Sequence, residues 1–230
     1  MKWNGLFFVV LLLLLTACSN NTELATQSTG EIDSEHSQQD VVDVTFLDAI
    51  GQEHTFTSPP KSIATLNPGI MDILLSVDAN VIGRPTISSE MTADVQAIQE
   101  IGNPHEPSFE QIAALNPEVL IVPPSFQRFA QTIAATGITV IYEDLNSIND
   151  IQDAITRYGE LFNSQEKALA LNKEIDDAKV TTIDSTQNAL IVYGAPGTYL
   201  AALDTSLYGD ILTTIGGKNI ASSLPGLDQY

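Results

Sequence analysis

Four residues of this chain are candidates to donate an atom to iron. Met71 offers a soft thioether, which suits haem iron. His105 lies in the Pro-rich segment 103–107, where its imidazole could ligate iron or contact a carboxylate. The phenols of Tyr199 and Tyr208 could ligate ferric iron or flank the face of a porphyrin. The alternatives are a core methionine, a surface histidine and aromatic packing.

A second group of residues could hold an anion. Arg84 and Thr86 follow a short apolar run and could meet a carboxylate. Asn67, followed by Pro68, and Ser108 each fit the cap position of a helix. Because the first backbone N–H groups of a helix have no partner within it, both helix starts could receive an anion.

The sequence contains none of the common catalytic signatures. It has no GxSxG, HExxH or GxGxxG motif and only three histidines. One cysteine excludes an internal disulfide and a CxxC metal site. The formal net charge of −20 argues against nucleic-acid binding, because nothing could neutralise a row of phosphates. We therefore expect a protein that is not an enzyme and has no nucleic-acid partner.

The first 18 residues have the pattern of a bacterial lipoprotein leader. The apolar run Leu6–Leu15 is shorter than the about 20 residues that span a membrane, and it suits a secretory signal. Leu15-Thr16-Ala17-Cys18 resembles a lipobox, in which the peptide is cut before the cysteine and the thiol is lipidated. We expect a signal peptide at 1–17, a lipid anchor on Cys18 and a flexible tether over 18–41. The protein would then sit on the outer face of the cytoplasmic membrane.

Strand-like and helix-like segments alternate in the next part of the chain. A hairpin is predicted over 41–57, and helices are predicted to begin at Asn67 and Ser108. Gln111 is expected to complete a capping box with Ser108. Further segments are predicted strands at 62–66, 81–83, 119–122 and 138–142, and a predicted helix at 126–136. Because the connections are short, this order predicts a parallel α/β sheet.

A long helical pattern runs from 148 to about 183. Gly159 and Asn163-Ser164 are expected to break it into two segments, the second of which is longer. A strand at 189–193 and a helix at 208–215 then begin a second α/β unit, which is too short to form a core alone. The expected domains are therefore an N-terminal α/β lobe at 42–147, a linking helix at 148–184 and an incomplete C-terminal lobe at 185–230.

This arrangement of two Rossmann-like α/β lobes joined by a long backbone helix resembles class III periplasmic-type binding proteins. That family serves importers of haem, ferric siderophores and cobalamin. The likeness is carried by IATLNP at 63–68, VIGRPT at 81–86, IGNP at 101–104, PSFEQI at 107–112 and LNPEVLI at 115–121. Similarity to the haem-receptor lipoproteins of Gram-positive cell-surface iron uptake is carried by GAPGTYL at 194–200 and LYGDIL at 207–212. GGKNI at 216–220 is shared more widely.

The resemblance implies roles for individual residues. Met71 matches the methionine that holds haem iron in that branch, and the partner histidine would lie beyond Tyr230. Glu110 matches a glutamate that docks onto an arginine of the permease. The implied partners are an ABC importer permease and haem or another iron chelate, with the receptor acting as a monomer. On this basis Met71→Ala is expected to reduce haem retention without unfolding the protein.

The basic residues of the folded part favour haem over ferric catecholates. A ferric catecholate carries about three negative charges, and its receptors need clustered arginines. Most of the cations in the folded part fall on predicted helix faces or in the long helical segment. The folded part has only Lys61, Arg84, Arg128, Arg157, Lys167, Lys173, Lys179 and Lys218. Haem is mostly apolar, with two carboxylates. We therefore expect haem as the ligand, with a ferric siderophore as the alternative; hydroxamates and cobalamin are nearly neutral and stay open.

Overall fold

The computed structural model describes residues 43–179, 188–195 and 198–224. The expected signal peptide at 1–17, the lipidation site Cys18 and the tether at 18–41 lie outside the described residues. No helix among the described residues is long and apolar enough to cross a membrane.

The described chain opens with the expected hairpin. Strand β1 (Val44–Leu47) pairs antiparallel with β2 (Glu53–Phe56). In the turn between them, one oxygen of Asp48 accepts hydrogen bonds from the N–H groups of Ile50, at 3.0 Å, and Gln52, at 2.9 Å. The backbone N–H of Tyr142 donates to the other oxygen, at 3.2 Å, which ties the hairpin to the sheet.

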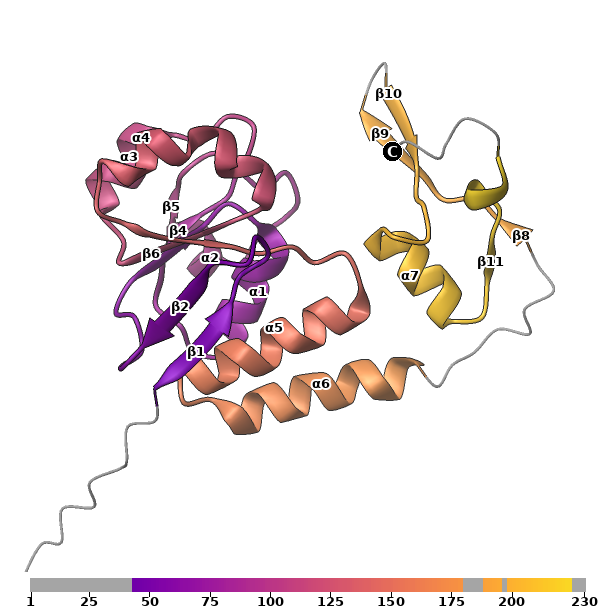
Figure 1. Cartoon of the computed structure of the whole chain (residues 1–230), viewed down its shortest axis with the longest axis horizontal. Helices are drawn as coiled ribbons and strands as arrows, with labels where there is room; N and C mark the ends of the chain where they lie inside the picture. Colours follow the sequence, from indigo (N-terminus) through magenta and orange to yellow (C-terminus); the bar gives the residue numbers. More distant parts are fainter. Residues whose placement is uncertain (1–42, 180–187, 196–197, 225–230) are drawn as a thin grey trace, which may run out of the picture. The chain divides into compact units, whose positions relative to one another are not determined.

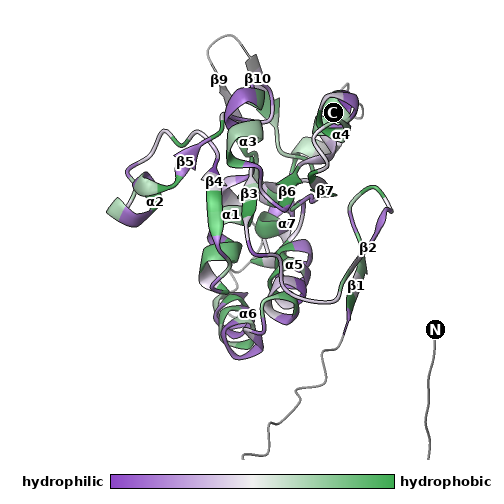
Figure 2. Ribbon diagram, turned by 90° about the vertical axis from the view of Figure 1, so that its left-hand side faces the viewer, coloured by the Kyte–Doolittle hydropathy of each residue, from purple (hydrophilic) through white to green (hydrophobic). Residues whose placement is uncertain are grey.

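A five-stranded parallel sheet forms the centre of the N-terminal part, in the order β5-β4-β3-β6-β7 (Figure 2). Its strands are β3 (Ile63–Thr65), β4 (Val81–Arg84), β5 (Gln99–Glu100), β6 (Val119–Val122) and β7 (Thr139–Tyr142). Every residue of β6 is buried, as expected for a parallel strand covered on both faces, and β4 and β6 are largely hydrophobic in Figure 2. The predicted α/β class is confirmed.

Alternating strand residues divide the core of the N-terminal part into two clusters. Ile63 and Ile121 pack with helix α1 (Pro68–Ser76) and with α5 (Ile148–Leu161). Ala64, Leu66, Leu120 and Val122 pack in the other cluster, which takes its helical residues from α3 (Phe109–Leu115), the 3-10 helix η1 (Pro124–Phe129) and α4 (Ala130–Ala134). A short helix, α2 (Ala93–Ala97), precedes β5.

Two local predictions differ from the structure. The helix predicted over 126–136 is the 3-10 turn η1 followed by α4. The side chain of Ser108 does cap α3, accepting from the N–H of Gln111 at 3.4 Å. The reciprocal bond of a capping box is absent from these residues, because the N–H of Ser108 donates to the carbonyl of Ile101, at 2.8 Å.

The linking segment is a helical hairpin and not one long helix. Helix α5 ends at Leu161, Asn163 adopts a left-handed φ of +55°, and α6 (Gln165–Lys179) runs back along α5 (Figure 1). Gly159 lies within α5 and does not break it. It allows α5 and α6 to approach closely, because a Cβ at this position would lie 2.4 Å from the Cβ of Ala168. The predicted break near residues 163–164 is confirmed.

The last described segments form a small second α/β unit. The strand predicted over 189–193 is split into β8 (Asn188–Ala189), parallel to β11 (Lys218–Asn219), and β9 (Val192–Ala195), antiparallel to β10 (Thr198–Ala201). The predicted helix is α7 (Leu207–Thr214), and a 3-10 turn, η2 (Ala221–Ser223), follows β11.

Candidate functional site

The strand order locates a crevice at the carboxyl edge of the parallel sheet. From β3 the chain continues to β4 and β5 on one side, and then returns to β6 and β7 on the other side of β3. In open α/β sheets, ligands bind outside the carboxyl ends of the strands where the connections diverge in this way. The divergence here lies between β3 and β6, and we take this edge as the candidate site.

Four sequence-predicted residues follow or end strands at this edge. Asn67 comes after β3, Arg84 ends β4 and Thr86 follows it, and His105 lies in the loop after β5. The carboxyl ends of parallel strands share one edge of a sheet, so the fold brings these four residues to the same side. Ligand contact by any of them stays a prediction.

Asn67 caps α1, as predicted. Its side-chain oxygen accepts from the N–H groups of Gly69, at 2.8 Å, and Ile70, at 3.3 Å. Pro68 has no N–H, and the N–H of Met71 donates to the carbonyl of Asn67, at 3.0 Å. The prediction of free N–H groups at this helix start is therefore wrong, because the cap already uses them.

Arg84 and Thr86 already hold a carboxylate of the chain itself. Nη1 of Arg84 lies 3.1 Å from Oε2 of Glu100, and Oγ1 of Thr86 lies 2.7 Å from Oε1. The hydrogen bond from Thr86 lowers the pKa of Glu100, burial acts against it, and Arg84 lowers it further. The predicted donors of a ligand-binding pair are thus occupied by a residue that the sequence did not single out.

The loop that carries His105 is closely braced. The side-chain oxygen of Asn103 accepts from the N–H groups of His105, at 2.9 Å, and Glu106, at 3.1 Å. Arg128 donates to the carbonyl of Pro104, at 2.9 Å. His105 itself is exposed, so its imidazole is accessible to a ligand. Among the described residues, no group of three or more His, Cys, Asp or Glu side chains could hold a metal ion.

Met71 is a core methionine, which is the alternative to an iron ligand that the sequence left open. Its side chain is 3% exposed and packs in the core with Ile63, Ile70 and Leu74. A thioether in this position fills the core and does not face the solvent. The structure therefore gives no support to Met71 as an iron ligand.

The two tyrosines differ in their surroundings. Tyr199 lies on β10, in a hairpin, and is 79% exposed. Tyr208 lies in the first turn of α7, as predicted, and is 52% exposed. Its ring centroid is 5.6 Å from that of Tyr193, which the sequence did not single out. Both phenols are open to a ligand.

Glu110 lies in the first turn of α3 and is exposed. A carboxylate in the first turn of a helix is favoured by the helix dipole. The residue is accessible to a basic group of another protein, which fits the docking role but does not test it.

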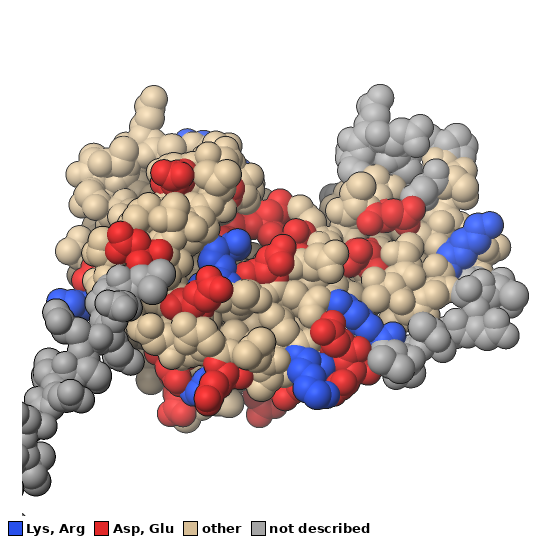
Figure 3. Space-filling model, turned by 60° about the horizontal axis from the view of Figure 1, so that its bottom comes forward, with Lys and Arg blue, Asp and Glu red and all other residues tan. Residues whose placement is uncertain are grey.

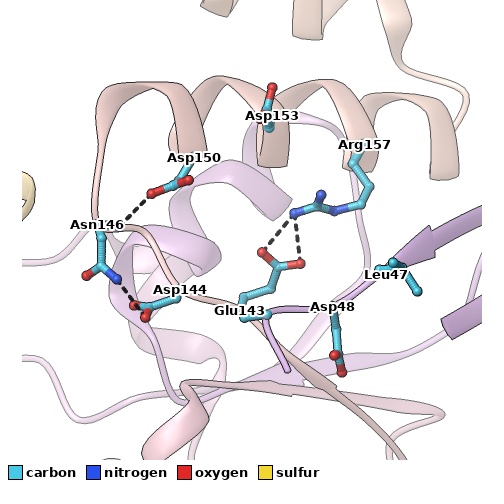
Figure 4. A pocket seen from close by; sticks show the side chains of 9 residues that line it. Leu47, Asp48, Glu143, Asp144, Asn146, Asp150, Asp153 and Arg157 are labelled. Carbon is cyan, nitrogen blue, oxygen red and sulfur yellow. Dashed lines mark hydrogen bonds and ion pairs between the residues drawn. The ribbon is translucent and has the colours of Figure 1, made fainter. Parts of the chain in front are cut away.

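A polar pocket of about 240 Å³ lies at the carboxyl end of β7 and was missed by the sequence reasoning (Figure 4). Among its lining residues, Nη2 of Arg157 lies 2.9 and 2.8 Å from the two carboxylate oxygens of Glu143. Burial raises the pKa of Glu143, against the opposing effect of Arg157. The remaining walls are Leu47, Asp48, Ala49, Asp144, Asn146, Asp150 and Asp153.

This pocket does not suit haem. Its volume is below the about 300–1,000 Å³ of typical small-molecule sites, and its walls are mostly acidic. Propionates would meet Asp144, Asp150 and Asp153, with the one arginine already paired to Glu143. The sequence signal for this pocket is Glu143, an acidic residue directly after a predicted strand. Its partner Arg157 lies 14 residues later, on a helix, so the sequence does not indicate the pair.

Comparison with known proteins identifies the family. Residues 63–230 match the periplasmic binding protein family. The chain belongs to this family. Over 154 residues it is 29% identical to the high-affinity heme uptake system protein IsdE of Staphylococcus aureus strain Newman, a match covering 63% of this chain and 52% of that protein. The chain thus spans about half the length of the curated relatives it matches.

Solved structures show the same fold. The structure of S. aureus IsdE complexed with heme aligns with a TM-score of 0.61 and 26% identity, covering 69% of this chain and 64% of that one. The siderophore-binding protein BauB, bound to acinetobactin and ferric iron, aligns with a TM-score of 0.64 and 22% identity, covering 80% and 70%. The latter likeness concerns the fold alone.

The residues that match the family model include the predicted ligand-binding residues at the carboxyl edge of the sheet. The match spans the region containing Asn67, Arg84, Thr86 and His105, and also Glu110. The hairpin residue Asp48 lies before it. The family predicted from the sequence is therefore confirmed, while the ligand contacts of these residues stay predictions.

Proposed function

We propose that this chain is part of an extracytoplasmic receptor that binds haem at the carboxyl edge of its parallel sheet and delivers it to an ABC importer for iron acquisition. The observation that carries the proposal is the similarity to the S. aureus heme uptake protein over 154 residues. Receptors of this kind bind and release their cargo, so no catalytic chemistry is proposed.

The described chemistry supports haem as the cargo. His105 presents an accessible imidazole in a braced loop, and imidazole is a common axial ligand of haem iron. Tyr199 and Tyr208 offer exposed phenols that could contact the ring or the iron. Met71 is not needed for this site. The axial ligand proposed from the described residues is therefore His105.

A ferric siderophore is the alternative cargo. BauB, which shares the fold, is described with such a ligand. Against a trianionic chelate stands the ion pair of Arg157 with the nearly buried Glu143, which leaves this cation without free charge. A nearly neutral hydroxamate complex would not face that obstacle.

We also propose the attachment and docking predicted from the sequence. Cys18 would carry the lipid that anchors the receptor to the outer face of the membrane. Glu110 would contact a basic residue of the permease, and the receptor would act as a monomer. A Cys18→Ala variant should be released into the medium; continued membrane attachment would contradict the anchor.

Haemin titration tests the cargo. Wild-type protein should develop a Soret band at equimolar haemin, and His105→Ala should weaken it while thermal stability stays unchanged, because the side chain is exposed. His54→Ala is the comparison variant, because it removes an imidazole that is buried beside Asp48 and lies outside this loop. Quenching of tyrosine fluorescence by a ferric hydroxamate, with no haem spectrum, would replace haem by the alternative.

A further inference from the structure

The charged cluster at the end of β4 is built as a clamp for one carboxylate. Two side chains, Arg84 and Thr86, each donate to a different oxygen of Glu100, at 3.1 and 2.7 Å. The strand pairing sets this geometry, because Arg84 and Glu100 are direct partners in the β4–β5 register. The N–H of Thr86 also donates to the carbonyl of Gly102, at 2.7 Å, which holds the second donor in place.

Arg84 depends on a negative partner. Its side chain is only 9% exposed, and a buried charge without a counter-ion is strongly unfavourable. Nη1 also donates to the carbonyl of Pro85, at 3.0 Å, while Nε is buried without a hydrogen-bond partner. Among the described residues, Glu100 is the carboxylate that pairs with this guanidinium.

The side chain of Glu100 can move away from the ion pair, whereas that of Arg84 is held in place by burial. The side chain of Glu100 is 45% exposed and belongs to the edge strand of the sheet, so it can turn into solvent without disturbing the core. Thr86 is exposed as well. An incoming carboxylate could therefore take the place of Glu100 and keep the charge of Arg84 compensated.

We propose that Arg84 and Thr86 form a binding site for a carboxylate of the ligand, and that Glu100 is its resident occupant, displaced when the ligand binds. This rests on the proposed function, and for haem the incoming group is a propionate. Glu100 is held beside the clamp by the chain, so it competes at a high effective concentration. It thereby acts as a specificity-determining residue that limits how much a ligand's carboxylates add to affinity.

The first experiment tests the clamp without any haem. Glu100→Ala removes the carboxylate bound by Arg84 and Thr86, so the melting temperature of this variant should be lower than that of wild type. Sodium formate should raise the melting temperature of the variant more than sodium chloride does at equal ionic strength. Glu106→Ala is the matched control, because Glu106 is exposed at the same edge, carries the same charge and makes no bond to Arg84. Formate should have no specific effect on wild type, on this control or on the double variant Arg84→Met with Glu100→Ala. An equal formate effect in all four proteins would overturn the proposal.

The second experiment compares haemin with haemin dimethyl ester, which keeps the ring and lacks the free carboxylates. Glu100→Ala should bind haemin about tenfold more tightly than wild type, the value of one additional charge-assisted hydrogen bond. The affinity for the ester should change by less than about twofold. Equal changes for both ligands, or none, would refute displacement by a propionate. If wild type binds neither ligand, the proposed haem function fails, while formate rescue still decides whether the clamp takes a carboxylate.

Discussion

Replacing Met71 separates a core methionine from an iron ligand. Met71→Ala removes three heavy atoms from a side chain that is 3% exposed and packed among Ile63, Ile70 and Leu74. Burial of this kind predicts a loss of about 2–5 kcal/mol in the free energy of unfolding, composed of lost transfer energy and a cavity. Chemical denaturation of wild type and variant measures it. Loss of haem by Met71→Ala could then follow from unfolding alone, contrary to the expectation of an intact variant drawn from the sequence.

Met71→Leu resolves that ambiguity. Leucine nearly conserves the volume and the apolar character, so the free energy of unfolding should change by less than about 1.5 kcal/mol. It has no sulfur, so it cannot ligate iron. We expect the Soret spectrum and haemin affinity of Met71→Leu to match those of wild type. A stable Met71→Leu protein whose Soret band is lost or shifted would refute the core interpretation and restore Met71 as the axial ligand.

Three further predictions concern the scaffold and the partner. Asn67→Ala should lower the free energy of unfolding by about 0.5–2 kcal/mol in denaturant titrations, because the cap bonds to Gly69 and Ile70 are lost; an unchanged midpoint would contradict that role. Burial acts to raise the pKa of Asp48, but its hydrogen bonds lower it overall, so wild type should lose stability as pH falls below about 4 and Asp48→Asn should lose less over that range; parallel pH profiles would exclude this linkage. Glu110→Ala should leave haemin affinity intact and slow import by whole cells, whereas Glu53→Ala, also an exposed glutamate, should not; normal uptake by Glu110→Ala would remove the docking role.

Local signals in the sequence were sufficient for most of the N-terminal fold. Short apolar runs of β-branched residues predicted β3, β4, β6 and β7, because parallel strands covered on both faces need continuous apolar sequence. Asn67-Pro68 predicted the start of α1, since both residues act within one helical turn. The common edge that carries Arg84 and His105 depends on the order of the strands in the sheet, which the structure supplies.

Interactions between distant residues were beyond those signals. The pair of Glu143 and Arg157 joins a strand end to the middle of a helix, and neither residue type declares its partner. Glycine weakens helices, which predicts a break at Gly159, but in the structure its close approach to Ala168 decides its role. Met71 was assigned by likeness to a family position, which does not say which way the side chain faces.

The charges of the described edge bear on which ligand it can hold. Arg84 and Arg157 are each paired with a carboxylate, that of Glu100 and that of Glu143. On the face that Figure 3 draws, several basic side chains likewise lie next to acidic ones. Arg128 differs: it is exposed, donates to a backbone carbonyl in the loop of His105 and lies 4.7 Å from the ring centroid of Phe129. The exposed guanidinium of Arg128 and the clamp of Arg84 and Thr86 can together bind two carboxylates. Haem has two carboxylates, its propionates. A trianionic chelate would need a third cation in a chain of net charge −20, so the same residues that accommodate haem disfavour it.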